Sequence, residues 1–214
     1  MSWKGRIIMS AYVITISREF GSGGREIGEK LADSLGIRCY DKSIITLAAD
    51  KSGLSPEYIE KAEESIFSPF LHNLTYSSFS TFDAMAVYEA PTSDKMFLAQ
   101  SAVIKELAAA GSCVIVGRCG DYVLRDNPNI LKLFITGKFE DRVARAVSRY
   151  KLPPEKADAA VKKTDKSRAN YYKYYTNLPW GDVNHFDLVI NTSYSGIDGA
   201  VEAVKALLRH KGLS

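Results

Sequence analysis

Short apolar runs rich in β-branched residues alternate along this chain with segments of helical spacing. The first run, residues 12–17, is followed by Ile27, Leu31 and Leu35, which repeat at helical intervals before Gly36. Because glycine commonly follows the last turn of a helix, Gly36 indicates a helix end. The alternation continues to the C-terminus. It predicts strands at about 12–17, 37–40, 113–116, 129–135 and 187–191, and helices at about 27–35, 41–50, 95–110, 139–149, 155–175 and 197–208.

Five short apolar strands separated by helices are typical of a parallel sheet that helices cover on both faces. The length of 214 residues suits one domain with a small insert. We therefore expect an α/β fold built on a five-stranded parallel sheet. A second methionine, Met9, indicates that residues 1–9 are an N-terminal extension and that residues 10–214 form the single domain.

The regular pattern breaks down over about residues 55–92. Ser55 and Pro56 indicate a helix start, with a serine cap before a proline at the first helical position. Beyond them, aromatic residues are scattered among serine and threonine with no steady period. We interpret this stretch either as irregular structure packed on the core, or as a substrate-side flap or a homodimer contact. The sequence leaves these alternatives open.

The composition, with 46% hydrophobic and 25% charged residues, is that of a globular protein. A net charge of +3 gives no reason to expect a nucleic-acid partner, and no apolar run approaches the roughly 20 residues of a membrane helix. The first residues lack an apolar stretch of signal-peptide length, so we expect a cytoplasmic protein. The cysteines and histidines lack metal-ligand spacing and are interpreted as residues without a chemical role: Cys39, Cys113, Cys119, His72, His185 and His210.

A glycine loop lies between the first strand and the first helix, at Gly21, Ser22, Gly23 and Gly24. Open α/β sheets bind anions at this place, on backbone N–H groups of the helix N-terminus. The P-loop pattern G-x-x-x-x-G-K-[ST] is not met, because Arg25 and Glu26 follow Gly24 in place of lysine and serine or threonine. A guanidinium also binds phosphate, and a carboxylate can reach Mg²⁺ through water. The loop therefore predicts phosphate binding, with simple closure of the turn as the alternative.

Several segments resemble, in order, the cytidylate kinase-like proteins, a branch of the P-loop nucleoside monophosphate kinases. They are ITISREFGSGGREIGEKLADSLGIRCYDKSII, VIVGRCGDYVL, LFITGKFEDRVAR, TDKSRANYYKYYT and FDLVINTS. The resemblance covers nearly the whole chain from about Tyr12 to Leu208. That branch commonly carries the GSGGRE loop, so the absence of the P-loop (Walker) lysine is typical of it.

The resemblance implies a P-loop nucleoside triphosphate hydrolase architecture of the nucleoside monophosphate kinase type. It places a helical lid at about residues 139–178 and an acceptor-side insert at about 55–92. It also implies an enzyme that transfers the γ-phosphoryl group of ATP, with Mg²⁺, to a nucleoside monophosphate such as CMP or to a small acceptor of similar charge. Binding partners are then a nucleotide or small phosphorylated substrate, without nucleic acid or membrane.

The same resemblance assigns roles to individual residues. The ATP phosphates would lie against Gly21, Ser22, Gly23, Gly24 and Arg25, with Glu26 assisting the metal through water and Arg142 and Arg145 acting from the lid on adenine or phosphate. Substrate would be bound by Asp41 beside the nucleoside, Arg118 on the acceptor phosphate, Asp165 on the cytidine nucleotide and Arg168 on phosphate. Arg25, Arg118 and Arg168 would be the catalytic residues, and residues 191–193 would line the adenine pocket.

Plainer interpretations stand beside these roles. Arg118 could form a structural salt bridge, Asp165 and Arg168 a surface pair, and Arg142 and Arg145 a solvated helix face. Lys162 lies near the position of a lid arginine in the true kinases, an imperfect match. The aromatic run 170–180 favours packing or a nucleotide pocket over single-strand nucleic-acid binding, which would need a continuous basic face.

A second function class stays open, a non-catalytic nucleotide- or phosphate-binding protein with a degenerate P-loop. Arg25 distinguishes the two classes. If the Arg25 side chain reaches the phosphates, catalysis is feasible. If it points to solvent, the non-catalytic binding protein is favoured.

Overall fold

The computed structural model describes residues 11–52 and 92–213. The expected N-terminal extension, the helix start at Ser55 and nearly all of the expected insert lie outside the described residues. His72 lies outside them as well. The flap, core-packing and dimer interpretations of that segment therefore remain predictions.

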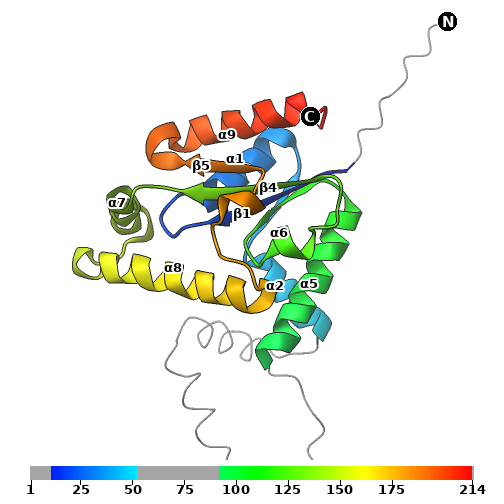
Figure 1. The fold of residues 1–214 in the computed structure, drawn as a ribbon, viewed down its shortest axis with the longest axis horizontal. Helices are drawn as coiled ribbons and strands as arrows, with labels where there is room; N and C mark the ends of the chain where they lie inside the picture. The colour runs from blue at the N-terminus through cyan, green and yellow to red at the C-terminus, as the bar shows by residue number, and fades with distance from the viewer. Residues whose placement is uncertain (1–10, 53–91, 214) are drawn as a thin grey trace, which may run out of the picture.

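The described chain contains a single five-stranded parallel sheet, as predicted (Figure 1). Its strands run in the order β2-β3-β1-β4-β5, so β1 lies at the centre. Val13 pairs with Cys113 on one side and with Ile130 on the other. The strands are β1 Val13–Arg18, β2 Arg38–Tyr40, β3 Cys113–Val116, β4 Ile130–Thr136 and β5 Leu188–Asn191.

Helices cover both faces of the sheet, because alternate strand residues point to opposite sides. Ile14 and Ile16 of β1 pack with α1 and α9, whereas Val13 packs with α2, α5 and the short α6. Figure 1 shows these two groups of helices above and below the strands. Their bounds are α1 Gly24–Leu35, α2 Ser43–Ser52, α5 Thr92–Ala110, α6 Gly120–Val123 and α9 Thr192–His210.

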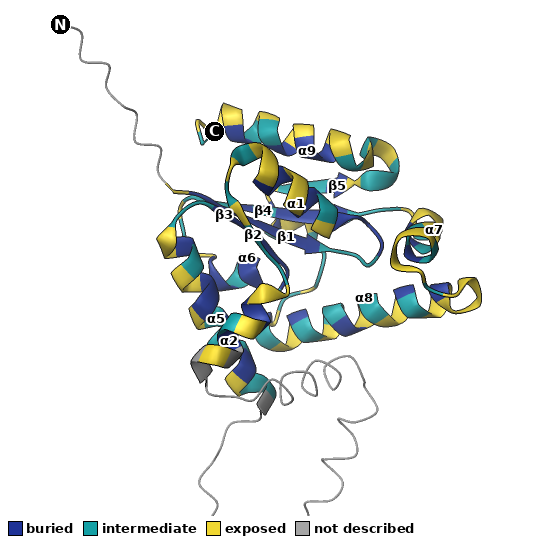
Figure 2. Cartoon of the chain, turned by 180° about the vertical axis from the view of Figure 1, so that it is seen from behind, coloured by how far each residue is buried: buried dark blue, intermediate teal, exposed yellow. Residues whose placement is uncertain are grey.

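Two further helices, α7 Phe139–Tyr150 and α8 Pro154–Thr176, occupy the segment for which a lid is predicted, and we call them the lid helices. They pack against each other and lie to one side of the sheet (Figure 1). Figure 2 shows that α8 turns a partly buried face inward while much of α7 is exposed. A 3₁₀ turn, Val183–His185, precedes β5. None of the described helices is both long and apolar enough to cross a membrane.

The aromatic run 170–180 packs against the domain. The ring of Tyr175 stacks on Phe97 of α5 at 4.0 Å between centroids, and Trp180 meets Phe134 edge to face at 5.4 Å. Tyr174 is the most exposed tyrosine of this run. These contacts agree with the packing interpretation of the run.

Helix α1 approaches the sheet closely at Gly28. A Cβ atom at this position would lie 2.9 Å from Val116 Cγ2 and 3.3 Å from Ile16 Cδ1, both in buried side chains. Interiors packed at this density do not accept an added side chain without shifting. Gly28 therefore sets the distance between α1, which begins at the glycine loop, and the strands beneath it.

We predict that Gly28→Val lowers the free energy of unfolding by about 1 to 3 kcal/mol, because the added methyl groups overpack the interface of α1 and the sheet. Urea denaturation of the variant and the parent protein measures the difference. Gly199→Val on α9 is the matched control, since its Cβ would meet only Ser195 at 3.6 Å. Equal stability of the two variants would contradict the prediction.

Candidate functional site

The glycine loop connects the carboxyl end of β1 to the N-terminus of α1. Gly21 and Gly23 have φ angles of 82° and 84°, in the left-handed region that favours glycine. Helix α1 begins at Gly24, and no side chain caps its first N–H groups. A helix N-terminus carries partial positive charge and donors that point out of the helix. The loop geometry therefore suits an anion, as the sequence predicts.

Two lid residues hold this loop from outside. Arg142 of α7 donates to the carbonyl oxygens of Gly137 at 3.0 Å and Phe20 at 3.2 Å, and it pairs with Asp165 of α8 at 2.5 Å. The other carboxylate oxygen of Asp165 accepts the backbone N–H of Phe20 at 2.7 Å. Glu19 completes the network, 3.3 Å from Arg142 Nε.

The solvated-face interpretation is therefore wrong for Arg142, whose side chain is 9% exposed. The surface-pair interpretation of Asp165 and Arg168 is wrong too, because both side chains bind backbone groups of the segment 18–20, just before the glycine loop. The structure places Arg142 and Asp165 against the loop itself. Their predicted contacts with ATP and cytidine remain predictions.

Arg25 and Glu26, the two residues that depart from the P-loop pattern, form ion pairs within the protein. Arg25 is half exposed and its Nε donates to Glu29 one turn along α1 at 2.9 Å; Asp41 lies 3.6 Å away. This hydrogen bond to Glu29 raises the pKa of Arg25. Glu26 pairs with Arg145 of α7 at 2.5 Å. Arg25 also lines a cavity together with Gly21, Gly23 and Gly24, and its predicted contact with the ATP phosphates remains a prediction.

A cavity of about 380 Å³ lies between the loop, α7 and the start of α9. The Thr192 hydroxyl on its wall donates to the Ser22 carbonyl at 2.9 Å, which ties the loop to the end of β5. Nε of Arg145 is one of three buried side-chain polar atoms without a hydrogen-bond partner among the described residues. A donor in this position is available to a ligand in the cavity. The residues on the wall are Gly21, Ser22, Asp141, Arg142, Arg145, Thr192, Ser193, Gly196 and Ile197.

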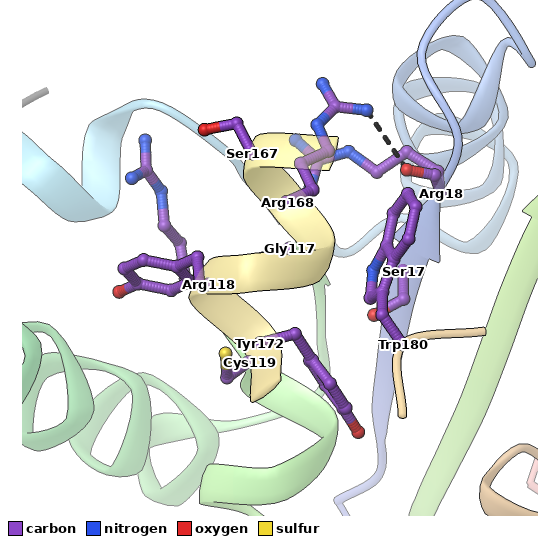
Figure 3. A pocket seen from close by; sticks show the side chains of 10 residues that line it. Ser17, Arg18, Gly117, Arg118, Cys119, Ser167, Arg168, Tyr172 and Trp180 are labelled. Atoms are coloured by element: carbon purple, nitrogen blue, oxygen red, sulfur yellow. Dashed lines mark hydrogen bonds between the residues drawn. The ribbon is translucent and has the colours of Figure 1, made fainter. Parts of the chain in front are cut away.

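A second cavity, of about 320 Å³, lies on the other side of the loop. Three arginines line both it and an adjoining smaller pocket of about 90 Å³ with aromatic walls. They are Arg18 from β1, Arg118 after β3 and Arg168 from α8, which converge from different elements (Figure 3). We call them the arginine cluster. Asp41 also lines the larger cavity.

Arg118 stands in an unusual backbone conformation. Gly117, Arg118 and Cys119 have φ angles of 79°, 58° and 52°, so three consecutive residues are left-handed. Such conformations cost about 1 kcal/mol or more at residues other than glycine, and they concentrate at functional sites. This turn at the end of β3 places the Arg118 side chain on the wall of both cavities.

The arginine cluster is partly buried, and burial affects two of its members. Desolvation lowers the pKa of Arg168, with Asp165 opposing the shift. Desolvation also lowers the pKa of Arg18 to about 9, and the nearby charges of Arg168 and Arg118 add to the effect. Both guanidinium groups stay positive at neutral pH. Like charges gathered in a desolvated site favour a bound anion.

Three side chains that contribute to this region were missed in the sequence analysis. Arg18 and Glu19 directly precede the glycine loop. Two charged residues at the point where a strand meets the loop were the sequence signal that could have identified them. Asp121 is buried and accepts hydrogen bonds from the hydroxyls of Tyr172 at 2.7 Å and Ser17 at 3.4 Å. No local pattern marks this contact, because α6, α8 and β1 meet only in the fold.

The groups on the site differ in how well they fit ATP and Mg²⁺. The loop, the helix N-terminus and the arginine cluster fit a polyphosphate, which needs N–H donors and cations. The described residues hold no group of three or more His, Cys, Asp and Glu side chains that could bind a metal ion. Glu26, the predicted indirect ligand, is surrounded by Arg145, Lys30 and Arg149. Mg²⁺ in phosphoryl-transfer sites is held largely by phosphates and water, so it would enter with ATP.

We predict that Arg142→Met lowers the free energy of unfolding by about 3 kcal/mol, because it leaves Asp165 and Glu19 without their shared buried partner. Arg149→Met on the same helix is the control. Its guanidinium is 66% exposed and only 4.0 Å from Glu26, so its loss should cost well under about 1 kcal/mol. Urea denaturation compares the two, and equal losses would refute the anchoring role of Arg142.

Burial raises the pKa of Asp121 above the ordinary value of 3.8, despite the hydrogen bonds from Tyr172 and Ser17. The folded protein therefore binds this proton more tightly than the unfolded chain does. The stability that results is complete below pH 3.8 and is lost as the pH rises to the folded pKa. We predict that Asp121→Asn gains stability relative to the parent as the pH rises above about 4. A constant difference in unfolding free energy over that range would contradict the shift.

Two curated cytidylate kinases are similar in sequence to this chain. The curated cytidylate kinase of Pyrococcus horikoshii is 25% identical over 199 residues, which are 92% of this chain and 88% of that protein. The cytidylate kinase of Ignicoccus hospitalis is 23% identical over 197 residues, 92% of this chain and 98% of that protein.

Solved structures give the same fold. A crystal structure of an uncharacterized protein from Eubacterium ventriosum has a TM-score of 0.67 and 26% identity, covering 92% of this chain and 98% of that one. Shikimate kinase from Bacteroides thetaiotaomicron has a TM-score of 0.53 at 10% identity, covering 94% and 99%. The likeness to shikimate kinase concerns the fold alone and confirms the expected P-loop kinase architecture.

The family model described as the cytidylate kinase-like family matches residues 13–194. This match begins in the central strand, includes the glycine loop, the arginine cluster and both lid helices, and ends just after β5. The chain therefore belongs to the cytidylate kinase-like family.

Proposed function

We propose that this protein transfers the γ-phosphoryl group of ATP to a nucleoside monophosphate of the CMP type, or to a small acceptor of similar charge. The observation that carries the proposal is the arginine cluster beside the glycine loop. Family membership and the P-loop kinase fold support nucleotide phosphotransfer in general. The names of the curated relatives support a cytidine nucleotide as the acceptor.

In this proposal each of the two cavities beside the loop binds one of the two substrates. The 380 Å³ cavity takes the nucleoside end of ATP, where the unpartnered Nε of Arg145 and the Thr192–Ser193 turn offer polar contacts. The phosphate chain of ATP crosses the glycine loop at the N-terminus of α1. The acceptor phosphate enters the 320 Å³ cavity, where Arg118 and Arg168 bind it and Asp41 faces the nucleoside.

The chain would act mainly by positioning and by charge. Phosphoryl transfer spreads negative charge over the oxygens of the group in transit, and guanidinium groups fixed in a water-poor site stabilise that charge. Mg²⁺ bound with ATP would neutralise further phosphate charge. Arg142 and Asp165 would act as positioning residues, because they bind the backbone of the loop at Phe20.

A non-catalytic nucleotide- or phosphate-binding protein is the second candidate. The position of Arg25 favours it, since this side chain is half exposed and is paired with Glu29. The arginine cluster fits a bound phosphate in either candidate, so it excludes simple loop closure but does not separate a kinase from a binding protein. Measuring whether ATP is turned over distinguishes the kinase from the binding protein.

We predict ATP-dependent phosphorylation of CMP or a related monophosphate, measured as ADP release and product formation across a panel of nucleoside monophosphates with Mg²⁺. Arg118→Met should lower kcat/KM by about 100- to 1000-fold, the usual loss when one fixed donor to developing charge is removed. Arg125→Met, outside both cavities, is the matched control and should retain activity. ATP binding without transfer to any acceptor of the panel would favour the binding protein.

A further inference from the structure

Arg18 runs from the glycine loop to the acceptor-side turn. Its side-chain stem packs beneath Gly24, where an added Cβ would lie 2.6 Å from Arg18 Cβ. Its guanidinium lies against Gly117 at the end of β3, where an added Cβ would overlap it. Figure 3 shows the Arg18 side chain beside that of Arg168, which donates to the Arg18 carbonyl at 3.0 Å. One side chain thus spans the place where a donor on the loop and an acceptor beside Arg118 would meet.

The charges around this place do not balance. Among the described residues, five cationic side chains line the 320 Å³ cavity, against two carboxylates, Glu19 and Asp41, while Glu29 outside the cavity pairs with one of the five, Arg25. Arg142 engages Glu19 at 3.3 Å. Asp41 is shared between Arg18 at 3.7 Å and Arg25 at 3.6 Å, both longer than a hydrogen bond. The surplus positive charge therefore fits a polyanion rather than an internal salt bridge.

Arg18 is better placed than Arg25 to meet that anion. The Arg25 side chain lines the 320 Å³ cavity too, but it is 55% exposed and is paired with Glu29 on its own helix. The Arg18 side chain is 20% exposed and lines both the 320 Å³ cavity and the adjoining smaller pocket. We propose that Arg18 takes the place of the missing Walker lysine and holds the γ-phosphoryl group of ATP during transfer. This inference rests on the proposed function and adds a catalytic residue to it.

The proposed step leaves Arg18 covalently unchanged. The bond between the γ-phosphorus and the β–γ bridging oxygen breaks, and its electron pair remains on ADP. An oxygen of the acceptor phosphate, already deprotonated at neutral pH, supplies the pair for the new P–O bond. The guanidinium donates hydrogen bonds to the oxygens of the group in transit, and its planar fork suits two such oxygens at once.

Binding of ATP and ADP tests this inference without knowledge of the acceptor. A residue that contacts only the γ-phosphoryl group contributes to ATP affinity and not to ADP affinity. Isothermal calorimetry of Arg18→Met should show ATP affinity reduced by about 10- to 100-fold, the value of one hydrogen bond between charged groups, with ADP affinity nearly unchanged. Arg18→Lys should recover part of the ATP affinity, because it keeps the charge but loses the fork.

Two further variants sharpen the test. Arg125→Met, outside both cavities, should leave both affinities as in the parent. Arg25→Met tests the competing assignment, in which Arg25 holds the γ-phosphoryl group. A larger loss of preference for ATP over ADP in Arg25→Met than in Arg18→Met would overturn the inference. Retained ADP affinity shows that Arg18→Met is folded. If Arg18→Met fails to fold, Arg18→Lys provides the test instead. An Arg18→Lys variant that prefers ATP over ADP as strongly as the parent protein does would also overturn the inference.

The inference and the proposed function can fail separately. An ATP preference that depends on Arg18, without transfer to any nucleoside monophosphate, would support the contact and refute the proposed transfer to such an acceptor. Transfer at the parental rate by Arg18→Met would refute the role of Arg18 and support the proposed function. A parent protein that binds ATP no better than ADP would overturn the inference.

Discussion

Parallel pairing of β1 between β3 and β4 is the constraint on which the site depends. Carboxyl ends of parallel strands meet at one edge, so the pairing brings the glycine loop, the Arg118 turn and the start of α7 together. Both faces of β1 are buried, since Val13 and Ile14 belong to cores on opposite sides. A slip of one residue would exchange those cores, so the register is strongly determined. Arg18, at the last position of β1, is thereby held at the site.

Charge pairs between the lid and the loop form the second layer of organisation. Arg142, Asp165 and Glu19 lie in surroundings where unpaired charges would be costly, and backbone groups of Phe20 and Gly137 satisfy their hydrogen bonds. A glycine-rich loop has little conformational preference of its own, because glycine loses more freedom on ordering than other residues. Contacts from α7 and α8 offset that loss and couple these two helices to the backbone of the loop.

Local charge matters more here than total charge. The chain carries a net charge of only +3, yet the cavity beside the loop collects five cations from separate elements. Their electrostatic field acts in surroundings with little water, where charge interactions are stronger than at the surface. This arrangement explains how a chain of low net charge concentrates positive charge beside the loop, and why composition gave no sign of it.

Periodicity alone determined the order of strands and helices, the parallel sheet and the glycine loop, because each depends on neighbours in the sequence. Motif position also selected Arg118, Arg168 and Asp41, which line one cavity. Only the tertiary structure decided that Arg25 pairs with Glu29, that Arg142 and Asp165 hold the loop, and that Arg18 lies at the site centre. These outcomes depend on distances between α1, α7, α8 and β3, elements far apart in the chain, and no local pattern encodes such distances.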